Sequence, residues 1–139
     1  MHAEILMPTV AMTAVIAVTW VKLYSNRIAE MKAKKIDVED FAGPNSVKDQ
    51  LENINASDNF KNLFEVPVLF YALCGFVAVS GVSSSLFVYG AWAYVVLRAA
   101  HSFIHITYNR VMHRFVVYAI STVWLFVLWA MFAVRLAGV

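Results

Sequence analysis

Four polar side chains recur at helical spacing inside a long apolar stretch of the sequence. Arg98, His101, His105 and Tyr108 lie three, four and three residues apart, so a helix places them along one face. Polar groups are costly to expose to hydrocarbon, and this stripe is therefore expected to face a bundle interior or a water-filled cleft. A polar stripe of this kind within an apolar helix marks a candidate functional site.

A second polar group lies earlier in the chain, just before the apolar stretch that begins near residue 62. Asn55, Asp58 and Asn59 are spaced to share one face of a helix. Amide and carboxylate groups together can hold a polar ligand through its ammonium, amide and carboxylate groups. The alternative is an ordinary polar helix start, because Asn and Asp are favoured at caps and turns.

A third group, Arg110, His113 and Arg114, follows the stripe. Anchoring on the cytoplasmic side of a membrane explains Arg110 well. The functional alternative is an anion site, because a guanidinium beside a thiol lowers the pKa of that thiol and stabilises the nucleophilic thiolate.

Arg98 and the two histidines of the stripe each have a second interpretation. Arg98 needs an acidic partner or water, and Glu65 or Asp58 could form a structural ion pair with it. His101 and His105 could bind a metal or haem, but two histidines on one helix without further ligands are insufficient. We therefore predict no metal site.

The composition indicates an integral membrane protein. Hydrophobic residues make up 61% of the 139-residue chain and charged residues 14%, against roughly 45–50% and 25% in soluble proteins. The net charge of +2 gives no indication of nucleic-acid binding. The expected partners are therefore the lipid bilayer and small molecules.

The apolar stretches predict an all-α membrane protein whose single domain, residues 1–139, is a bundle of four transmembrane helices. The expected spans are about 5–24, 62–80, 86–108 and 115–135, with a polar loop at about 25–61. We expect the first helix to continue to about Lys35. A helical pattern resumes at Ser46, which is a plausible cap with Asp49 three residues later.

The distribution of Lys and Arg predicts the orientation. The first loop carries seven of these residues, the second none, and the third Arg110 and Arg114. Because cationic loops stay in the cytoplasm, both termini are expected outside it. The resemblance to a known family described below implies that this membrane is a bacterial inner membrane.

Two motifs, in this order and topology, resemble the membrane-associated eicosanoid and glutathione metabolism (MAPEG) family. The family's Asn-x-x-Glu segment at the start of the second span is similar to NASDNF at residues 55–60. Its Arg-x-x-His/Tyr-x-x-x-Tyr segment is similar to RAAHSFIH at residues 98–105. An arginine further along the family's sequences stands at a distance that matches Arg114. The likeness covers nearly the whole chain.

This resemblance implies a bacterial-type glutathione transferase or peroxidase that detoxifies lipophilic electrophiles. It implies a homotrimer with glutathione, as cosubstrate, at subunit interfaces open to the cytoplasm, while the electrophile arrives from the bilayer. Arg114 would stabilise the glutathione thiolate. The residues implied to bind glutathione are Arg27, Asn55, Asp58, Asn59, Arg98, His101 and His105.

Three departures from the family pattern keep an alternative open. Asp58 is one methylene shorter than the usual Glu, His105 occupies the tyrosine position, and Leu51 stands where synthases often have arginine. The alternative is a non-catalytic lipid- or ligand-binding membrane scaffold of the same fold. A four-helix cytochrome is a third interpretation.

Overall fold

The computed structural model describes residues 3–41, 51–52 and 54–138. Within these ranges the chain is helical and contains no strand, as the sequence predicts. The α-helices are α1 (Met7–Lys34), α2 (Asn55–Asn62), α3 (Pro67–Ser80), α4 (Ser85–Ile106) and α5 (Val111–Leu136). Two short 3-10 helices, η1 (Ala3–Leu6) and η2 (Val38–Phe41), flank α1.

Proline and glycine set several of the helix ends. Pro67 is the first residue of α3, where its missing N–H group does no harm. The same missing donor interrupts the helical segment Asn55–Ser80 at residues 63–66. The second span, predicted at about 62–80, therefore corresponds to α3, and α2 precedes it. Gly81, with φ 73°, adopts the left-handed conformation that ends α3.

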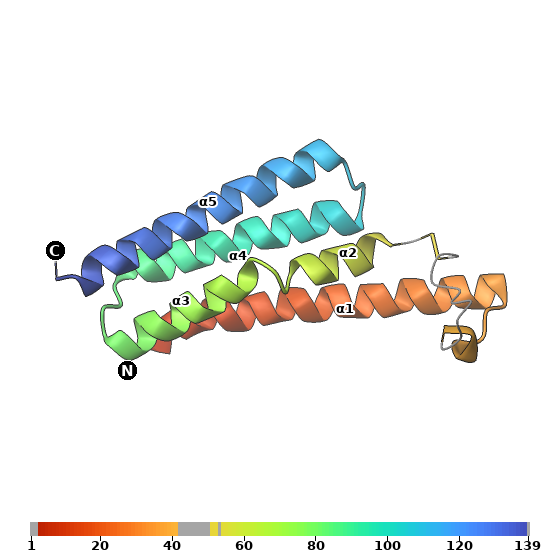
Figure 1. The fold of residues 1–139 in the computed structure, drawn as a ribbon, viewed down its shortest axis with the longest axis horizontal. Coiled ribbons are helices and arrows are strands. Elements are labelled where there is room, and N and C mark those ends of the chain that lie inside the picture. The colour runs from red at the N-terminus through yellow and green to blue at the C-terminus, as the bar shows by residue number, and fades with distance from the viewer. Residues whose placement is uncertain (1–2, 42–50, 53, 139) are drawn as a thin grey trace.

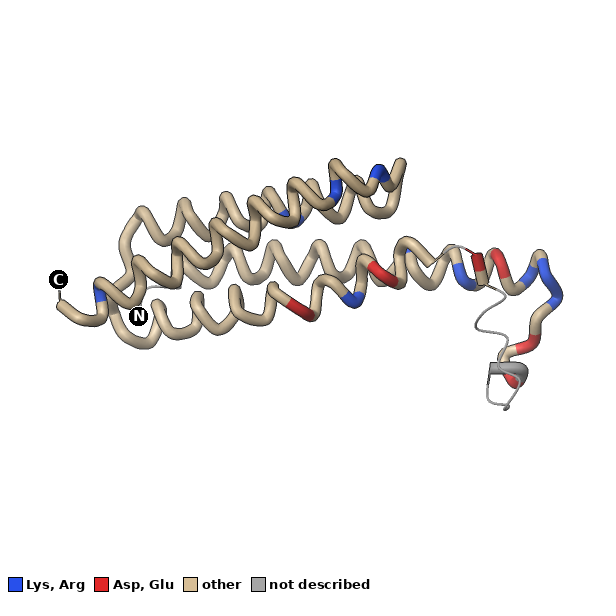
Figure 2. The backbone as a smooth tube through the Cα atoms, turned by 45° about the horizontal axis from the view of Figure 1, so that its top comes forward, with Lys and Arg blue, Asp and Glu red and all other residues tan. Residues whose placement is uncertain are grey.

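The helices form an elongated bundle (Figure 1). α4 and α5 make an antiparallel hairpin, and α1 runs beside α2 and α3 before it projects beyond the other helices. Both termini lie at one end of the bundle, and the α4–α5 connection and α2 lie towards the other. Figure 2 shows that most charged residues gather towards this second end.

α4 is the interior helix of the bundle. Ten of its 22 residues are buried, against four of 28 in α1 and four of 26 in α5. The Tyr94 ring stacks on Phe70 of α3 at 4.6 Å between centroids. The indole N–H of Trp124 in α5 donates to the carbonyl of Gly90 at 2.9 Å. α4 therefore joins the two halves of the bundle.

Among the described residues, three helical segments are long and apolar enough to cross a membrane. They are Glu4–Lys34, Asn55–Ser80 and Val111–Leu136. Their exposed side chains include large apolar ones, such as Val79 at 89% exposure, that suit contact with lipid. The protein is therefore an integral membrane protein. α4 is less apolar because it carries the polar stripe, but its 22 residues would extend about 33 Å, close to the thickness of a hydrocarbon core.

The segment before α2 corrects one prediction. Ser46 and Asp49 lie outside the described residues, but Leu51, Glu52 and Ile54 are not helical. The backbone N–H of Glu52 donates to the side chain of Glu30 at 2.6 Å, so it is not available for a helical bond. Lys34 bridges the Glu30 and Glu52 carboxylates, both at 2.9 Å, and holds this segment against α1. The predicted continuation of the first helix, to about Lys35, is confirmed by α1.

Gly90 is where α4 and α5 approach most tightly among the described glycines, and Gly90→Ala is expected to destabilise the protein. A Cβ atom here would lie 2.6 Å from Cδ2 of Leu128, which is itself buried and has little room to move. Gly75→Ala is the matched control, because a Cβ on that helical glycine meets nothing within 4 Å. Thermal unfolding in detergent should show a lower Tm for Gly90→Ala and an unchanged or higher Tm for Gly75→Ala. Equal Tm values would contradict this packing argument.

Candidate functional site

Polar side chains from α1, α2, α4 and α5 meet inside the bundle, towards the end where α4 turns into α5. Arg98, His101 and His105 are 0%, 2% and 1% exposed. The prediction that this stripe faces a bundle interior is confirmed. The inclusion of Tyr108 is wrong, because α4 ends at Ile106 and the Tyr108 side chain is 53% exposed. The Tyr108 hydroxyl instead lies 3.4 Å from Nδ1 of His113.

Arg98 has no carboxylate partner among the described residues, so the predicted ion pair with Glu65 or Asp58 is wrong. Its Nη2 donates to the backbone carbonyl of Asn62 at 3.1 Å, and its Cζ lies 5.4 Å from the ring centroid of Tyr118. The last carbonyls of a helix lack partners within that helix, and Asn62 is the last residue of α2. Arg98 therefore closes the end of α2, while its Nε and Nη1 have no partner.

Asn59 joins three helices through its side-chain amide. It is 0% exposed. Its Nδ2 donates to Oγ1 of Thr19 in α1 at 3.3 Å, and its Oδ1 accepts from Oγ of Ser102 in α4 at 3.3 Å. Asn59 was predicted from the sequence. Its two hydroxyl partners were not, because they belong to no motif.

Arg114, in the first turn of α5, contacts two other elements. Its Nη1 lies 3.2 Å from Nε2 of His105 and donates to Oδ1 of Asn109 at 2.9 Å. Asn109 in turn donates from Nδ2 to Oδ1 of Asn55 in α2 at 2.8 Å. The backbone carbonyl of Arg114 lies 3.1 Å from Nδ1 of His101, and since a carbonyl only accepts, His101 donates there. This polar chain links α2, α4 and α5.

Asn109 is a site residue that the sequence argument missed. It has a positive φ of 45° in the short connection between α4 and α5. Asn tolerates this left-handed conformation better than most residues, because its short polar side chain can hydrogen-bond locally. An Asn beside a helix end was the only signal in the sequence that could have found it.

Asn59 and Arg98 bond to partners outside the polar chain. Two further predicted site residues, Asp58 and Arg27, lie apart from that chain. Asp58 is half-exposed on α2 and forms an ion pair with Lys61 at 3.7 Å. Arg27 lines a groove formed by the end of α1 and the segment that follows, and no other predicted site residue lines that groove. The structure thus brings Asn55, Arg114 and His105 into one polar chain and leaves Arg27 outside it.

The MAPEG family profile matches residues 5–134, nearly the whole chain. The chain belongs to the MAPEG family. This is a family of membrane proteins of glutathione and eicosanoid metabolism, and the resemblance found from the two motifs is confirmed. No curated protein and no solved structure matches the chain.

The structure connects the two stretches that carry the MAPEG resemblance. Asn59 of the first stretch accepts a hydrogen bond from Ser102 of the second. A second connection runs from Asn55 through Asn109 and Arg114 to His105 of the second stretch. The two motifs are therefore parts of one polar site in the fold.

The second half of the chain contributes positive charge to the site but no negative charge. Residues 66–139 contain no Asp or Glu, yet they include Arg98 and Arg114. Arg114 and Asn55 are partly exposed, whereas Arg98 is fully buried. A cationic group that solvent can reach, backed by a second cation without a carboxylate, favours the binding of an anion.

Proposed function

We propose that this MAPEG protein is a membrane-bound, glutathione-dependent transferase or peroxidase that acts on lipophilic electrophiles. The observation that carries the proposal is the position of Arg114. Its guanidinium is partly exposed, is oriented by His105 and Asn109, and belongs to a half of the chain without acidic residues. A fixed guanidinium of this kind would stabilise the glutathione thiolate.

The side chains of the site suit the charges of glutathione, which has two carboxylates, one ammonium and one thiol. Asp58 is half-exposed and would hold the ammonium, and the amide of Asn55 would bond to the peptide groups. Arg114 would stabilise the thiolate, and the buried Arg98 would add positive potential behind it. The unpartnered Nε and Nη1 of Arg98 are consistent with this need for an anion.

The buried members of the predicted set would act by positioning the exposed ones. Asn59, Arg98, His101 and His105 are each at most 2% exposed. His105 orients the Arg114 guanidinium, and His101 bonds to the Arg114 backbone. His101 and His105 would therefore fix the geometry at the start of α5, which electrostatic stabilisation requires.

The reaction needs a thiolate and a lipophile brought together. In the transferase reaction, the sulfur attacks an electrophilic carbon, the S–C bond forms as the leaving group departs, and the thiol proton passes to water. A groove of about 280 Å³ between α1 and α4, lined mainly by apolar side chains and also by Thr19 and Ser102, would admit a lipophile from the bilayer. We further propose, from the family, that the functional unit is a homotrimer in a bacterial inner membrane, with its termini outside the cytoplasm.

One observation favours the alternative of a non-catalytic scaffold. The stripe of Arg98, His101 and His105 is closed to solvent within the single chain, as expected of a network that only holds helices together. A scaffold would keep the polar chain and the apolar groove without binding glutathione.

Calorimetry with glutathione and the purified protein tests the proposal and should show binding in the micromolar to millimolar range. Asp58→Ala is expected to weaken this binding about tenfold or more, because a charged hydrogen bond to the ammonium is lost. Lys61→Ala is the matched control, since it removes the ion pair of Asp58 but keeps the carboxylate. Absence of binding to the folded protein would contradict the proposal and favour the scaffold.

A further inference from the structure

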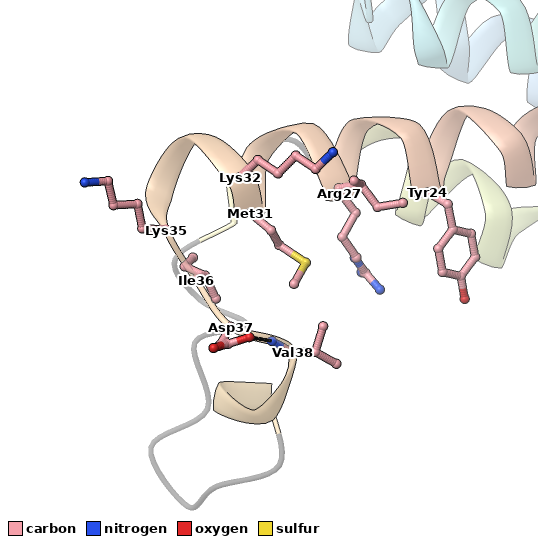
Figure 3. Close-up of a pocket in the computed structure, with 9 residues that line it drawn as sticks. Tyr24, Arg27, Met31, Lys32, Lys35, Ile36, Asp37 and Val38 are labelled. Atoms are coloured by element: carbon pink, nitrogen blue, oxygen red, sulfur yellow. Dashed lines mark hydrogen bonds between the residues drawn. The ribbon is translucent and has the colours of Figure 1, made fainter.

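A second candidate binding site lies away from the polar chain, on the part of α1 that projects beyond the other helices (Figure 3). It is a groove of about 880 Å³ between the last turns of α1 and the segment that contains η2. In Figure 3, the side chains of Tyr24, Arg27 and Met31 point from α1 towards Val38 on the opposite wall.

Specific backbone conformations and hydrogen bonds shape this groove. Lys35 adopts a left-handed conformation, with φ 53° and ψ 40°, and ends α1. The N–H of Ile36 donates to the carbonyl of Met31 at 3.0 Å, which turns the chain back on itself. The carboxylate of Asp37 accepts from the N–H of Val38 at 3.2 Å and fixes the opposite wall.

The lining combines positive charge with exposed apolar surface. Arg27, Lys32 and Lys35 line the groove, but the ammonium groups of Lys32 and Lys35 point away from it (Figure 3). Among the described residues that line the groove, Asp37 is the one acidic residue. Ile28 is 50% exposed and Val38 is 72% exposed. Such a surface is complementary to a ligand with an anionic head and an apolar body.

The length of α1 places the groove at the membrane surface. A hydrocarbon core of about 30 Å is spanned by about 20 helical residues, which starting from Met7 ends near Asn26. The exposed rings of Trp20 and Tyr24 pack at 4.8 Å between centroids, as aromatic side chains do at a membrane interface. Arg27 and the groove therefore begin at the level of the lipid headgroups.

We propose that this groove is a binding site for an anionic phospholipid. The Arg27 guanidinium, which points into the groove (Figure 3), binds the phosphate, and the apolar side chains of Ile28, Met31 and Val38 cover the glycerol and upper acyl chain. In this assignment the Arg27 guanidinium contacts lipid.

Lipid retention tests this proposal. The protein would be incorporated into nanodiscs of equal parts phosphatidylglycerol and phosphatidylcholine, released, and examined for retained lipid by native mass spectrometry. The wild type should retain phosphatidylglycerol in preference. Arg27→Gln should lower this preference roughly fivefold, the effect of one cationic residue at an anionic surface. Val38→Asp, which sets a carboxylate opposite Arg27, should abolish it, and Arg27→Lys should largely preserve it.

Lys22→Gln is the matched control, because Lys22 is an exposed cation of α1 that does not line the groove. An equal loss in Lys22→Gln would overturn the proposal, since any nearby charge would then suffice. Undiminished preference in both Arg27→Gln and Val38→Asp would also overturn it. Competition by soluble glycerol phosphate would identify a site for a free phosphate ester. Loss of glutathione binding in Arg27→Gln, without loss of retained lipid, would show that Arg27 binds glutathione. Either result would overturn the lipid assignment.

Discussion

Arg114→Ala is expected to abolish the ultraviolet absorbance of the bound glutathione thiolate and to lower turnover about 100-fold or more. The guanidinium stabilises the negative sulfur, and no second cation bonds to the same partners in the described chain. Glutathione affinity should fall less than turnover, because Asp58 and Asn55 remain. Difference spectra of the purified protein with glutathione, followed by conjugation assays with a lipophilic electrophile, measure both effects.

Two matched variants make the Arg114 result specific. Arg110→Ala removes an exposed arginine four residues earlier that has no side-chain hydrogen bond or ion pair in the described structure, and it should leave the thiolate absorbance unchanged. Arg114→Lys keeps the charge but replaces the planar guanidinium, whose Nη1 contacts both His105 and Asn109, with an ammonium on a shorter side chain, so an intermediate loss is expected. Full thiolate absorbance in Arg114→Ala would exclude the proposed role.

Helical periodicity was sufficient to predict the interior face of α4. Arg98, His101 and His105 repeat at helical spacing, and all three are buried because an apolar helix cannot expose them to lipid. Tyr108 continued the same spacing but lies beyond the end of the helix. No proline or glycine marks that end, and the left-handed Asn109 is a weaker signal than either.

The partners of the buried groups were harder to predict than the groups themselves. A search for charges could only offer Glu65 or Asp58 to Arg98, whereas the actual acceptor is a backbone carbonyl. That carbonyl is available because α2 ends at Asn62, ahead of the break that Pro67 imposes. Sequence patterns locate helix ends only approximately, and a contact that depends on one end carbonyl therefore requires the structure.

The same uncertainty in helix ends affected the segment before α2. Hydrophobic spacing suggested a helix from Ser46, but Glu52 is held to α1 by bonds to Glu30 and Lys34. These contacts join residues that are about twenty positions apart in the chain. Local periodicity contains no information about them, so the tertiary contacts override the local preference.

The burial of Arg98 raises the question of what the residue contributes to stability. Arg98 donates one charged hydrogen bond to Asn62, which contributes about 1.5–3 kcal/mol. Its cation–π contact with the Tyr118 ring contributes up to about 2 kcal/mol. Against these stands the desolvation of a guanidinium, several kcal/mol per ion, with two N–H positions left unpartnered. These opposing contributions are of similar size, so the charge itself is not required for folding.

Two substitutions at Arg98 separate its volume from its charge. Arg98→Ala is expected to lower the free energy of unfolding by about 2–5 kcal/mol, because it leaves a cavity in the interior of α4. Arg98→Met fills most of that volume without a charge, so its stability should stay within about 1 kcal/mol of the wild type. Glutathione binding should nevertheless be weakened in Arg98→Met, since the site loses its second cation. Thermal unfolding followed by tryptophan fluorescence, together with calorimetry, measures both properties. If Arg98→Met is as unstable as Arg98→Ala, the bond to Asn62 is the main contribution, and the arginine is retained for structure rather than for binding.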